Sequence, residues 1–182
     1  MRTIEVLKRE QADAVAQPIF DNLKKAIGMV PNLYATIGYS GETLRDFLTF
    51  QTTVESNSFT KKEAEAINLV VSQVNGCAYC LAAHTAIAKM NGFSEEETLQ
   101  LRDASIADAR LSAITKLAQS LTINRGNAAV GLVEDFFAQG FTEKHLIELI
   151  GVVAAKTFSN YVHNTTQVPV DFPAAKPLPV TA

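Results

Sequence analysis

Cysteine, excess charge and long apolar runs are all scarce in this chain of 182 residues. With only two cysteines, a secreted scaffold held together by disulfides is excluded, because such scaffolds spread their cysteines over distant segments. The net charge is −3 and no cluster of Lys and Arg could follow a phosphate backbone, so we expect no nucleic-acid partner. No apolar run could span a bilayer, and residues 1–8 turn polar too soon for a signal peptide. We therefore expect no membrane association and a cytoplasmic location.

Apolar residues, by contrast, are plentiful. They make up 47% of the chain against 19% for charged residues, which is enough for a packed core and excludes global disorder. The length suits one domain. Because the apolar fraction is somewhat higher than a monomer needs, we expect part of it to be buried between subunits.

The hydrophobic pattern is helical along most of the chain, and alternation with period two is rare. Capping boxes at Thr60–Glu63 and Ser94–Glu97 mark two helix starts. Four prolines after Val168 forbid a helix there. We therefore predict an all-α fold, with one helical domain over residues 1–168 and an extended proline-rich arm over 169–182. The predicted helices cover about residues 12–27, 31–38, 41–50, 60–75, 77–90, 94 onward, 108–126, 130–137 and 142 onward.

The two cysteines lie three positions apart, as Cys77-Ala78-Tyr79-Cys80, and His84 follows. On a helix that begins near Cys77, these spacings place both thiols and the imidazole on one face. A helix N-terminus stabilises a thiolate, which favours Cys77 as the more acidic thiol. Neighbouring thiols also allow a sulfenic acid formed on one to be captured by the other. The pattern indicates thiol redox chemistry.

Two other interpretations of the cysteine pair stay open. A zinc site needs about four ligands, and only His84 joins the pair, although His145 or His163 could complete it. Two inert core cysteines are the other alternative. Glu65 lies among apolar residues, where a carboxylate with a raised pKa could accept a proton, but its spacing alone favours an ordinary solvated helix residue.

Three further polar or aromatic residues are explained by structural roles. Tyr79 is interpreted as a packing residue. Asn160 and His163 are interpreted as polar groups at the end of the last helix.

Glu65, eleven intervening residues, Cys77-x-x-Cys80, three more residues and His84 together resemble a known signature. It is that of the alkylhydroperoxidase AhpD-like branch of the carboxymuconolactone decarboxylase family. The flanking Asn75-Gly76 and the upstream Val30-Pro31-Asn32-Leu33 are also similar to peroxidase-related members. The resemblance covers roughly residues 12–172.

This resemblance implies an AhpD-like helical bundle that assembles into trimers or hexamers. It also implies reduction of hydroperoxides by a dithiol–disulfide cycle without metal or other cofactor. Cys80 would be the peroxidatic thiol and Cys77 the resolving one, with Glu65 and His84 as a proton relay. The reductant would be a lipoylated or thioredoxin-like protein. Some members carry a His where this chain has Tyr79, which implies a shorter relay here.

Two other functions remain as alternatives. The family also contains lactone decarboxylases, which use carboxylate and imidazole acid–base chemistry and need no cysteine pair. A redox-sensing or zinc-binding module is the non-enzymatic alternative. The intact cysteine pair favours the peroxidase.

Overall fold

The computed structural model describes residues 4–179, which form one short 3₁₀ helix, nine α-helices and no strand. The prediction of an all-α fold is confirmed. The 3₁₀ helix η1 spans Arg9–Gln11, and the α-helices are α1 (Ala16–Ile27), α2 (Asn32–Ile37), α3 (Gly41–Ser56), α4 (Lys61–Val74), α5 (Ala78–Met90), α6 (Glu95–Arg102), α7 (Ala109–Ile123), α8 (Leu132–Ala138) and α9 (Glu143–Thr166).

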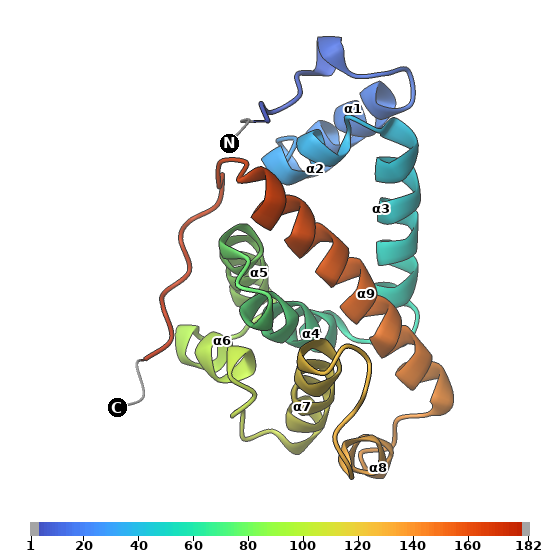
Figure 1. Ribbon diagram of the computed structural model, residues 1–182. Coiled ribbons are helices and arrows are strands. Elements are labelled where there is room, and N and C mark those ends of the chain that lie inside the picture. The colour runs from blue at the N-terminus through green and yellow to red at the C-terminus, as the bar shows by residue number, and fades with distance from the viewer. Residues whose placement is uncertain (1–3, 180–182) are drawn as a thin grey trace.

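Helix α4 is the centre of the bundle. It packs against α5, α6, α7 and α9, and its apolar side chains, including Ile67 and Val70, are fully buried. The long α9 crosses the molecule diagonally beside α3, while α1 and α2 cover one end and α7 and α8 the other (Figure 1). Because α4 is enclosed, its polar residues Glu65, Asn68 and Ser72 are buried as well.

The predicted capping boxes form as expected. The Thr60 hydroxyl accepts the N–H of Glu63, whose carboxylate accepts the N–H of Thr60, and Ser94 and Glu97 make the same pair at α6. Helix α1 begins four residues later than predicted, at Ala16, so Pro18 lies in its first turn, where a missing N–H costs nothing.

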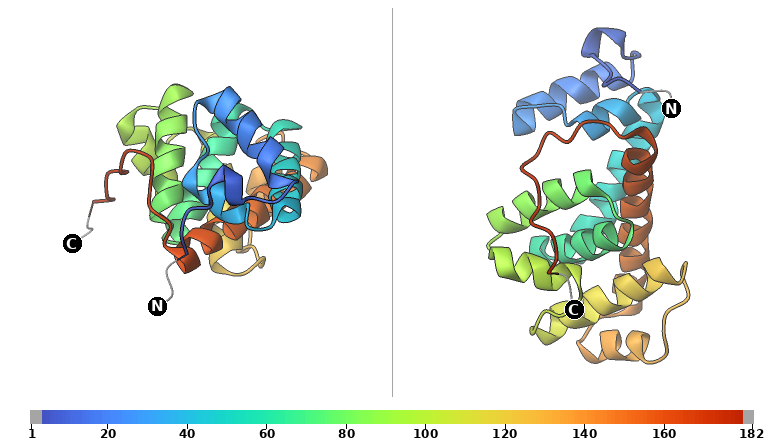
Figure 2. Two further views of the ribbon diagram at one scale, coloured as in Figure 1. Left: turned by 90° about the horizontal axis from the view of Figure 1, so that it is seen from above. Right: turned by 60° about the vertical axis from the view of Figure 1, so that its left-hand side comes forward.

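After α9 the chain forms no helix or strand through Pro179, and residues 180–182 of the predicted arm lie outside the described part. This C-terminal segment, residues 168–179, runs back along α5 towards α6 (Figure 2). It is tied to its own chain, because Asn32 N–H donates to the Asp171 carboxylate at 2.8 Å and the Arg102 guanidinium donates to the Lys176 carbonyl at 2.6 Å. Within residues 4–179 no helix is long and apolar enough to cross a membrane.

Candidate active site

A tight turn between α4 and α5 positions the two cysteines. Gly76 has φ +62°, a left-handed conformation that favours glycine, and lets the chain reverse at the end of α4. Cys77 is then the N-cap of α5 rather than its first residue, and its sulfur accepts the N–H of Cys80 at 3.3 Å. The thiols are therefore neighbours through a capping interaction.

The two thiols lie in different surroundings. Cys77 is 0% exposed, and Cys80 is 2% exposed but lines a cavity. The Cys77 thiol, as hydrogen-bond donor to Cys80, lowers the pKa of Cys80, and the electrostatic effect of the nearby Lys156 and His84 side chains lowers it further against the opposing effect of burial. The same hydrogen bond, together with burial, raises the pKa of Cys77. The expectation from the helix dipole that Cys77 is the more acidic thiol is therefore wrong, because this local hydrogen bond and the charges near Cys80 outweigh the dipole.

A buried chain of polar side chains adjoins Cys80. The Glu65 carboxylate of α4 lies 2.8 Å from His84 Nδ1, and His84 Nε2 lies 2.6 Å from Lys156 Nζ of α9. The structure thus brings together Glu65, His84 and both cysteines, as the sequence suggested. The alternative interpretation of Glu65 as an ordinary solvated helix residue is wrong, because Glu65 is buried and contacts the His84 imidazole.

Lys156 was missed at the sequence level. It stands 72 positions from His84 within the apolar run of α9, and no spacing rule links it to the cysteine motif. One signal in the sequence could have indicated it. Lys156 lies on the same helix face as Val152, Ala155 and Ser159, which are buried, so the helical repeat places its side chain inward.

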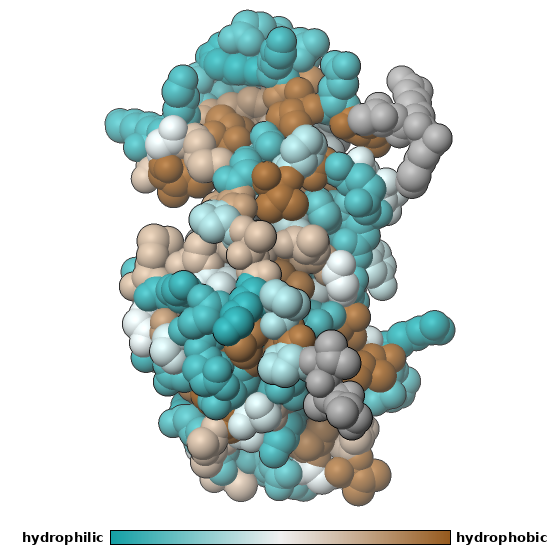
Figure 3. Space-filling view, turned by 90° about the vertical axis from the view of Figure 1, so that its left-hand side faces the viewer, coloured by the Kyte–Doolittle hydropathy of each residue, from teal (hydrophilic) through white to brown (hydrophobic). Residues whose placement is uncertain are grey.

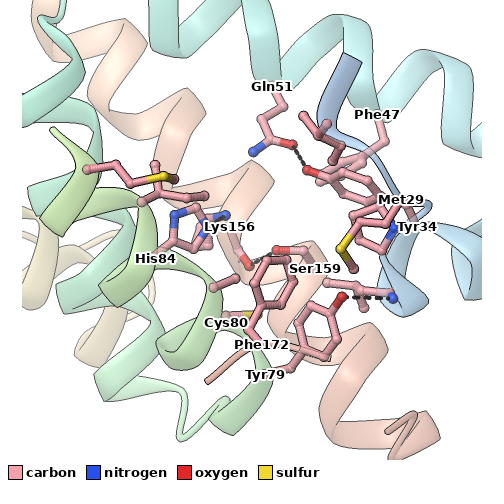
Figure 4. Close-up of a pocket in the computed structure, with 16 residues that line it drawn as sticks. Met29, Tyr34, Phe47, Gln51, Tyr79, Cys80, His84, Lys156, Ser159 and Phe172 are labelled. Carbon is pink, nitrogen blue, oxygen red and sulfur yellow. Dashed lines mark hydrogen bonds between the residues drawn. The ribbon is translucent and has the colours of Figure 1, made fainter. Parts of the chain in front are cut away.

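The cavity has a volume of about 290 Å³ and is walled mainly by apolar and aromatic side chains. Figure 4 shows Cys80, His84 and Lys156 on one side of it, with Tyr34 and Phe47 facing them and Phe172 beside Cys80. The outer surface is indented between the α1–α2 end and the remainder of the molecule, with apolar side chains around the indentation (Figure 3). The residues that line the cavity are Ile27, Met29, Pro31, Leu33, Tyr34, Phe47, Gln51, Tyr79, Cys80, Ala83, His84, Ile87, Met90, Lys156, Ser159 and Phe172.

Asn160 and His163 are not simple helix-end residues. Asn160 is fully buried, its side-chain oxygen accepts from the Asn75 amide at 2.9 Å, and its amide also lowers the pKa of both thiols by hydrogen bonding. The His163 ring lies 5.5 Å from the Tyr79 ring, and its buried Nδ1 has no hydrogen-bond partner. Asn160 therefore belongs to the surroundings of the thiols.

Tyr79 holds the C-terminal segment. Its hydroxyl accepts the N–H of Leu33 at 3.3 Å, and its ring meets that of Phe172 edge-on at 5.6 Å. Burial and a hydrogen bond to Asp171 raise the pKa of the Tyr79 phenol. Tyr79 is thus a neutral packing residue, as interpreted from the sequence.

The described residues offer little to a metal ion. No group of three or more His, Cys, Asp or Glu side chains within residues 4–179 is arranged to hold one. Both ring nitrogens of His84 are already engaged, and His145 instead accepts the N–H of Thr142 at the start of α9. A zinc site at the cysteine pair would have to displace these contacts.

Solved structures share this fold over nearly the whole chain, although no curated protein matches it. An uncharacterized peroxidase-related protein from Silicibacter sp. TM1040 has 23% identity and a TM-score of 0.78, covering 93% of this chain and 94% of its own. The alkylhydroperoxidase AhpD core, an uncharacterized peroxidase-related protein from Ralstonia eutropha JMP134, has 21% identity and a TM-score of 0.81, covering 92% and 91%. A variant of the debrominase Bmp8 in complex with 2,3,4-tribromopyrrole has 18% identity and a TM-score of 0.78, covering 94% and 93%.

At these identities the likeness is one of fold, and the predicted AhpD-like helical fold is confirmed. The family model of the carboxymuconolactone decarboxylase family matches residues 41–122, the stretch that holds Glu65, both cysteines and His84. The resemblance drawn from the sequence is thereby confirmed: over residues 41–122 the chain is similar to the carboxymuconolactone decarboxylase family.

Proposed function

We propose that the protein is a thiol peroxidase that reduces organic hydroperoxides through a dithiol–disulfide cycle of Cys80 and Cys77. The observation that carries this proposal is the position of Cys80, whose thiol has a lowered pKa and lines an apolar cavity of about 290 Å³. The thiolate is the form that attacks a peroxide oxygen. An apolar wall suits the organic part of the substrate.

The cycle uses both sulfurs in a fixed order. The Cys80 thiolate attacks the terminal peroxide oxygen, the O–O bond breaks, and the substrate leaves as an alcohol while Cys80 becomes a sulfenic acid. Cys77 then displaces water from that sulfenic acid and forms the disulfide. The inner position of Cys77, outside the cavity lining, supports its role as the resolving thiol. The buried pair of Glu65 and His84, joined at 2.8 Å, supports the proton transfers of this cycle.

The decarboxylase alternative has less support from the cavity. A dicarboxylic substrate brings two negative charges, which need cationic partners when they are desolvated. The described lining contains one lysine and no arginine, and that lysine is already bound to His84. A metal-binding module is likewise less supported, since His84 is held by Glu65 and Lys156.

Reductive dehalogenation is a second candidate. Aromatic side chains of Tyr34, Phe47 and Phe172 border the cavity and suit a flat aromatic substrate, and the debrominase Bmp8 has the same fold. A thiolate that takes a halogen from carbon, followed by displacement of halide by the second thiol, would end in the same disulfide while the carbon takes a proton. Release of bromide from a bromopyrrole by the reduced protein tests this candidate.

A thiol donor must regenerate the pair. Because a disulfide between Cys77 and Cys80 would be almost wholly buried, we propose a lipoyl group as the reductant, since its slender arm can enter the cavity better than the surface of a thioredoxin-like protein. Such a donor and free thiols suit a reducing compartment such as the cytoplasm. Dihydrolipoamide and thioredoxin can be compared directly as electron donors in peroxide turnover.

Single-turnover chemistry of two serine variants tests the proposed order. Cys77→Ser should consume one equivalent of cumene hydroperoxide and leave a sulfenic acid on Cys80 that a dimedone probe traps. Cys80→Ser should consume almost none. Mass spectrometry identifies the labelled residue, and a sulfenic acid on Cys77 in the Cys80→Ser protein would reverse the order. Wild-type protein that consumes no hydroperoxide with any reductant would reject the function.

A further inference from the structure

Lys156 occupies an unusual position for a lysine. It is 3% exposed, comes from α9, and is the one Lys or Arg among the described residues that line the cavity with Cys80. A buried ammonium is costly unless it is paired. Its partner is His84, since Nζ lies 2.6 Å from His84 Nε2 (Figure 4).

With Lys156 protonated, the hydrogen bonds that join it to His84 and Glu65 can run in one direction only. An ammonium has three donors and no acceptor, so Lys156 donates to His84 Nε2, and the imidazole proton is then on Nδ1. That proton is donated to the Glu65 carboxylate, 2.8 Å away. Both ring nitrogens are therefore engaged, and neither is free to exchange a proton directly with a thiol or a substrate oxygen in the cavity.

We propose that Lys156 is a catalytic residue that delivers the proton to the leaving oxygen of the hydroperoxide, with His84 and Glu65 orienting it from behind. This inference rests on the proposed peroxidase function and names the group that acts at the reacting atoms. Lys156 has two N–H donors left after its bond to His84, and it faces the same cavity as the attacking sulfur.

The step balances in atoms and charge. The Cys80 thiolate forms a bond to the terminal oxygen, the O–O bond breaks, and its electron pair leaves on the alkoxide. The alkoxide takes a proton from the Lys156 ammonium, which gives an alcohol, a sulfenic acid on Cys80 and a neutral amine. Sulfur is oxidised by two electrons and the peroxide bond is reduced by the same two.

The remainder of the cycle restores the lysine. Cys77 condenses with the sulfenic acid to form the disulfide and water, with no demand on Lys156. When a dithiol donor reduces the disulfide, the new Cys80 thiol gives its proton to the Lys156 amine. This transfer regenerates thiolate and ammonium together, so the proton needed for the next alkoxide is supplied by the thiol that makes the next attack.

The Glu65 carboxylate balances this arrangement. Without it the buried ammonium would have the Cys80 thiolate as its one negative neighbour and a neutral imidazole as its hydrogen-bond partner. The link from Glu65 through His84 brings a second negative charge towards Lys156 while the lysine is protonated. Glu65 and His84 are thus positioning residues for Lys156 in this assignment.

Two substrates with different leaving groups test the role. An alkyl hydroperoxide expels a strongly basic alkoxide that needs a proton, whereas a peroxycarboxylic acid expels a weakly basic carboxylate that needs none. Lys156→Met, which preserves length without a proton, should slow Cys80 oxidation by tert-butyl hydroperoxide by about 10²-fold or more. Oxidation by peroxyacetic acid should change far less. The rates are divided by the fraction of Cys80 present as thiolate, measured by ultraviolet absorbance. A change in the pKa of Cys80 in the variant then does not affect the comparison.

The control is Lys144→Met, a solvent-facing lysine at the start of the same helix, which should react like wild type with both oxidants. An equal decrease in the rate of Cys80 oxidation by both oxidants in Lys156→Met would overturn the assignment. That result would mean that the lysine acts on the Cys80 thiolate and not on the leaving oxygen. If the variant does not fold, the test uses the wild type with a series of alkyl hydroperoxides that differ in the basicity of the leaving alkoxide. Its rate should depend little on that basicity, because Lys156 protonates the leaving oxygen. A steep dependence would overturn the assignment. Wild type inert to both oxidants would reject the peroxidase function itself.

Discussion

The difference between the two cysteines is set by one hydrogen bond and by which sulfur faces the cavity. The hydrogen bond from the Cys77 thiol is the main cause of the lowered pKa of Cys80, which is about 6. Because this pKa is lowered, the thiolate is present above that pH and is lost as the pH falls through it. We therefore expect the rate of peroxide reduction to rise with pH around pH 6 and then to level off.

Two variants of Cys77 isolate that hydrogen bond. Cys77→Ala removes the donor and should raise the pKa of Cys80, whereas Cys77→Ser retains a hydroxyl donor and should keep the pKa close to its wild-type value. The thiolate absorbance of Cys80 against pH measures both. Equal pKa values in the two variants would show that Lys156 and His84, rather than Cys77, set the acidity of Cys80.

Glu65→Gln tests the carboxylate as a charge. The amide oxygen can still accept from His84 Nδ1, so the fold should be retained while the negative charge is lost. We expect turnover of an alkyl hydroperoxide to fall by about 10²-fold, with unchanged circular dichroism. Glu96→Gln on the exposed side of α6 is the matched control. Wild-type turnover of Glu65→Gln across the pH range would reduce Glu65 to a structural residue.

The sequence predicted the parts of the site that lie close together along the chain. Cys77, Cys80 and His84 follow one another within two turns, and resemblance added Glu65 from the neighbouring helix. Lys156 and Asn160 could not be predicted, because their approach to the thiols depends on how α9 crosses α4 and α5. Nothing in local spacing encodes that crossing.

At the level of the helices, the N-terminal cap of α4 supports the placement of Glu65. Thr60→Ala removes the hydroxyl that accepts the Glu63 N–H at 3.2 Å and should cost about 1 kcal/mol of stability. For a chain of this length that lowers Tm by roughly 2–4 °C. Thr60→Ser, which keeps the hydroxyl, should melt near wild type. A thermal melt checks both, and an unchanged Tm in Thr60→Ala would show that the cap contributes nothing measurable.

Helix starts were predicted well where a cap was visible and less well where burial decided them. Thr60 and Ser94 each cap the helix expected from them. The beginning of α5 differs by a single residue, yet that residue is Cys77, and as N-cap it accepts a backbone N–H instead of lying on the helix face. A shift of one residue in the start of α5 therefore changes the hydrogen bonding of the Cys77 sulfur.

The C-terminal segment supplies part of the cavity wall. Phe172 lines the cavity and packs on Tyr79, and its backbone neighbour Asp171 is bound to Asn32. Phe172→Ala should therefore weaken binding of a bulky substrate. We expect KM for cumene hydroperoxide to rise about tenfold, equivalent to about 1.4 kcal/mol of lost contact. Hydrogen peroxide, too small to reach that wall, should keep its kinetics, and an equal change for both substrates would contradict the assignment.

At the scale of the whole molecule, an apolar stripe lies on the outer face of α9. It consists of Ile147, Ile150, Phe158 and Tyr161, which recur at helical spacing and are all exposed. Phe50 of the adjacent α3 is exposed as well. Large contiguous apolar surface is uncommon on a monomer and marks an interaction site.

We therefore predict a homo-oligomer, a trimer or hexamer by family resemblance, that buries this stripe. Light scattering on the purified protein should give a mass that is a multiple of 19.7 kDa at micromolar concentration. Ile147→Glu combined with Tyr161→Glu places charges at residues that are 68% and 60% exposed in the single chain, and should dissociate the assembly without unfolding it. Val130→Glu is the control, because Val130 is fully exposed in the loop before α8 and lies outside the stripe. A monomeric wild type would contradict the prediction. An oligomer that the double variant leaves intact would show that a different surface holds the subunits together.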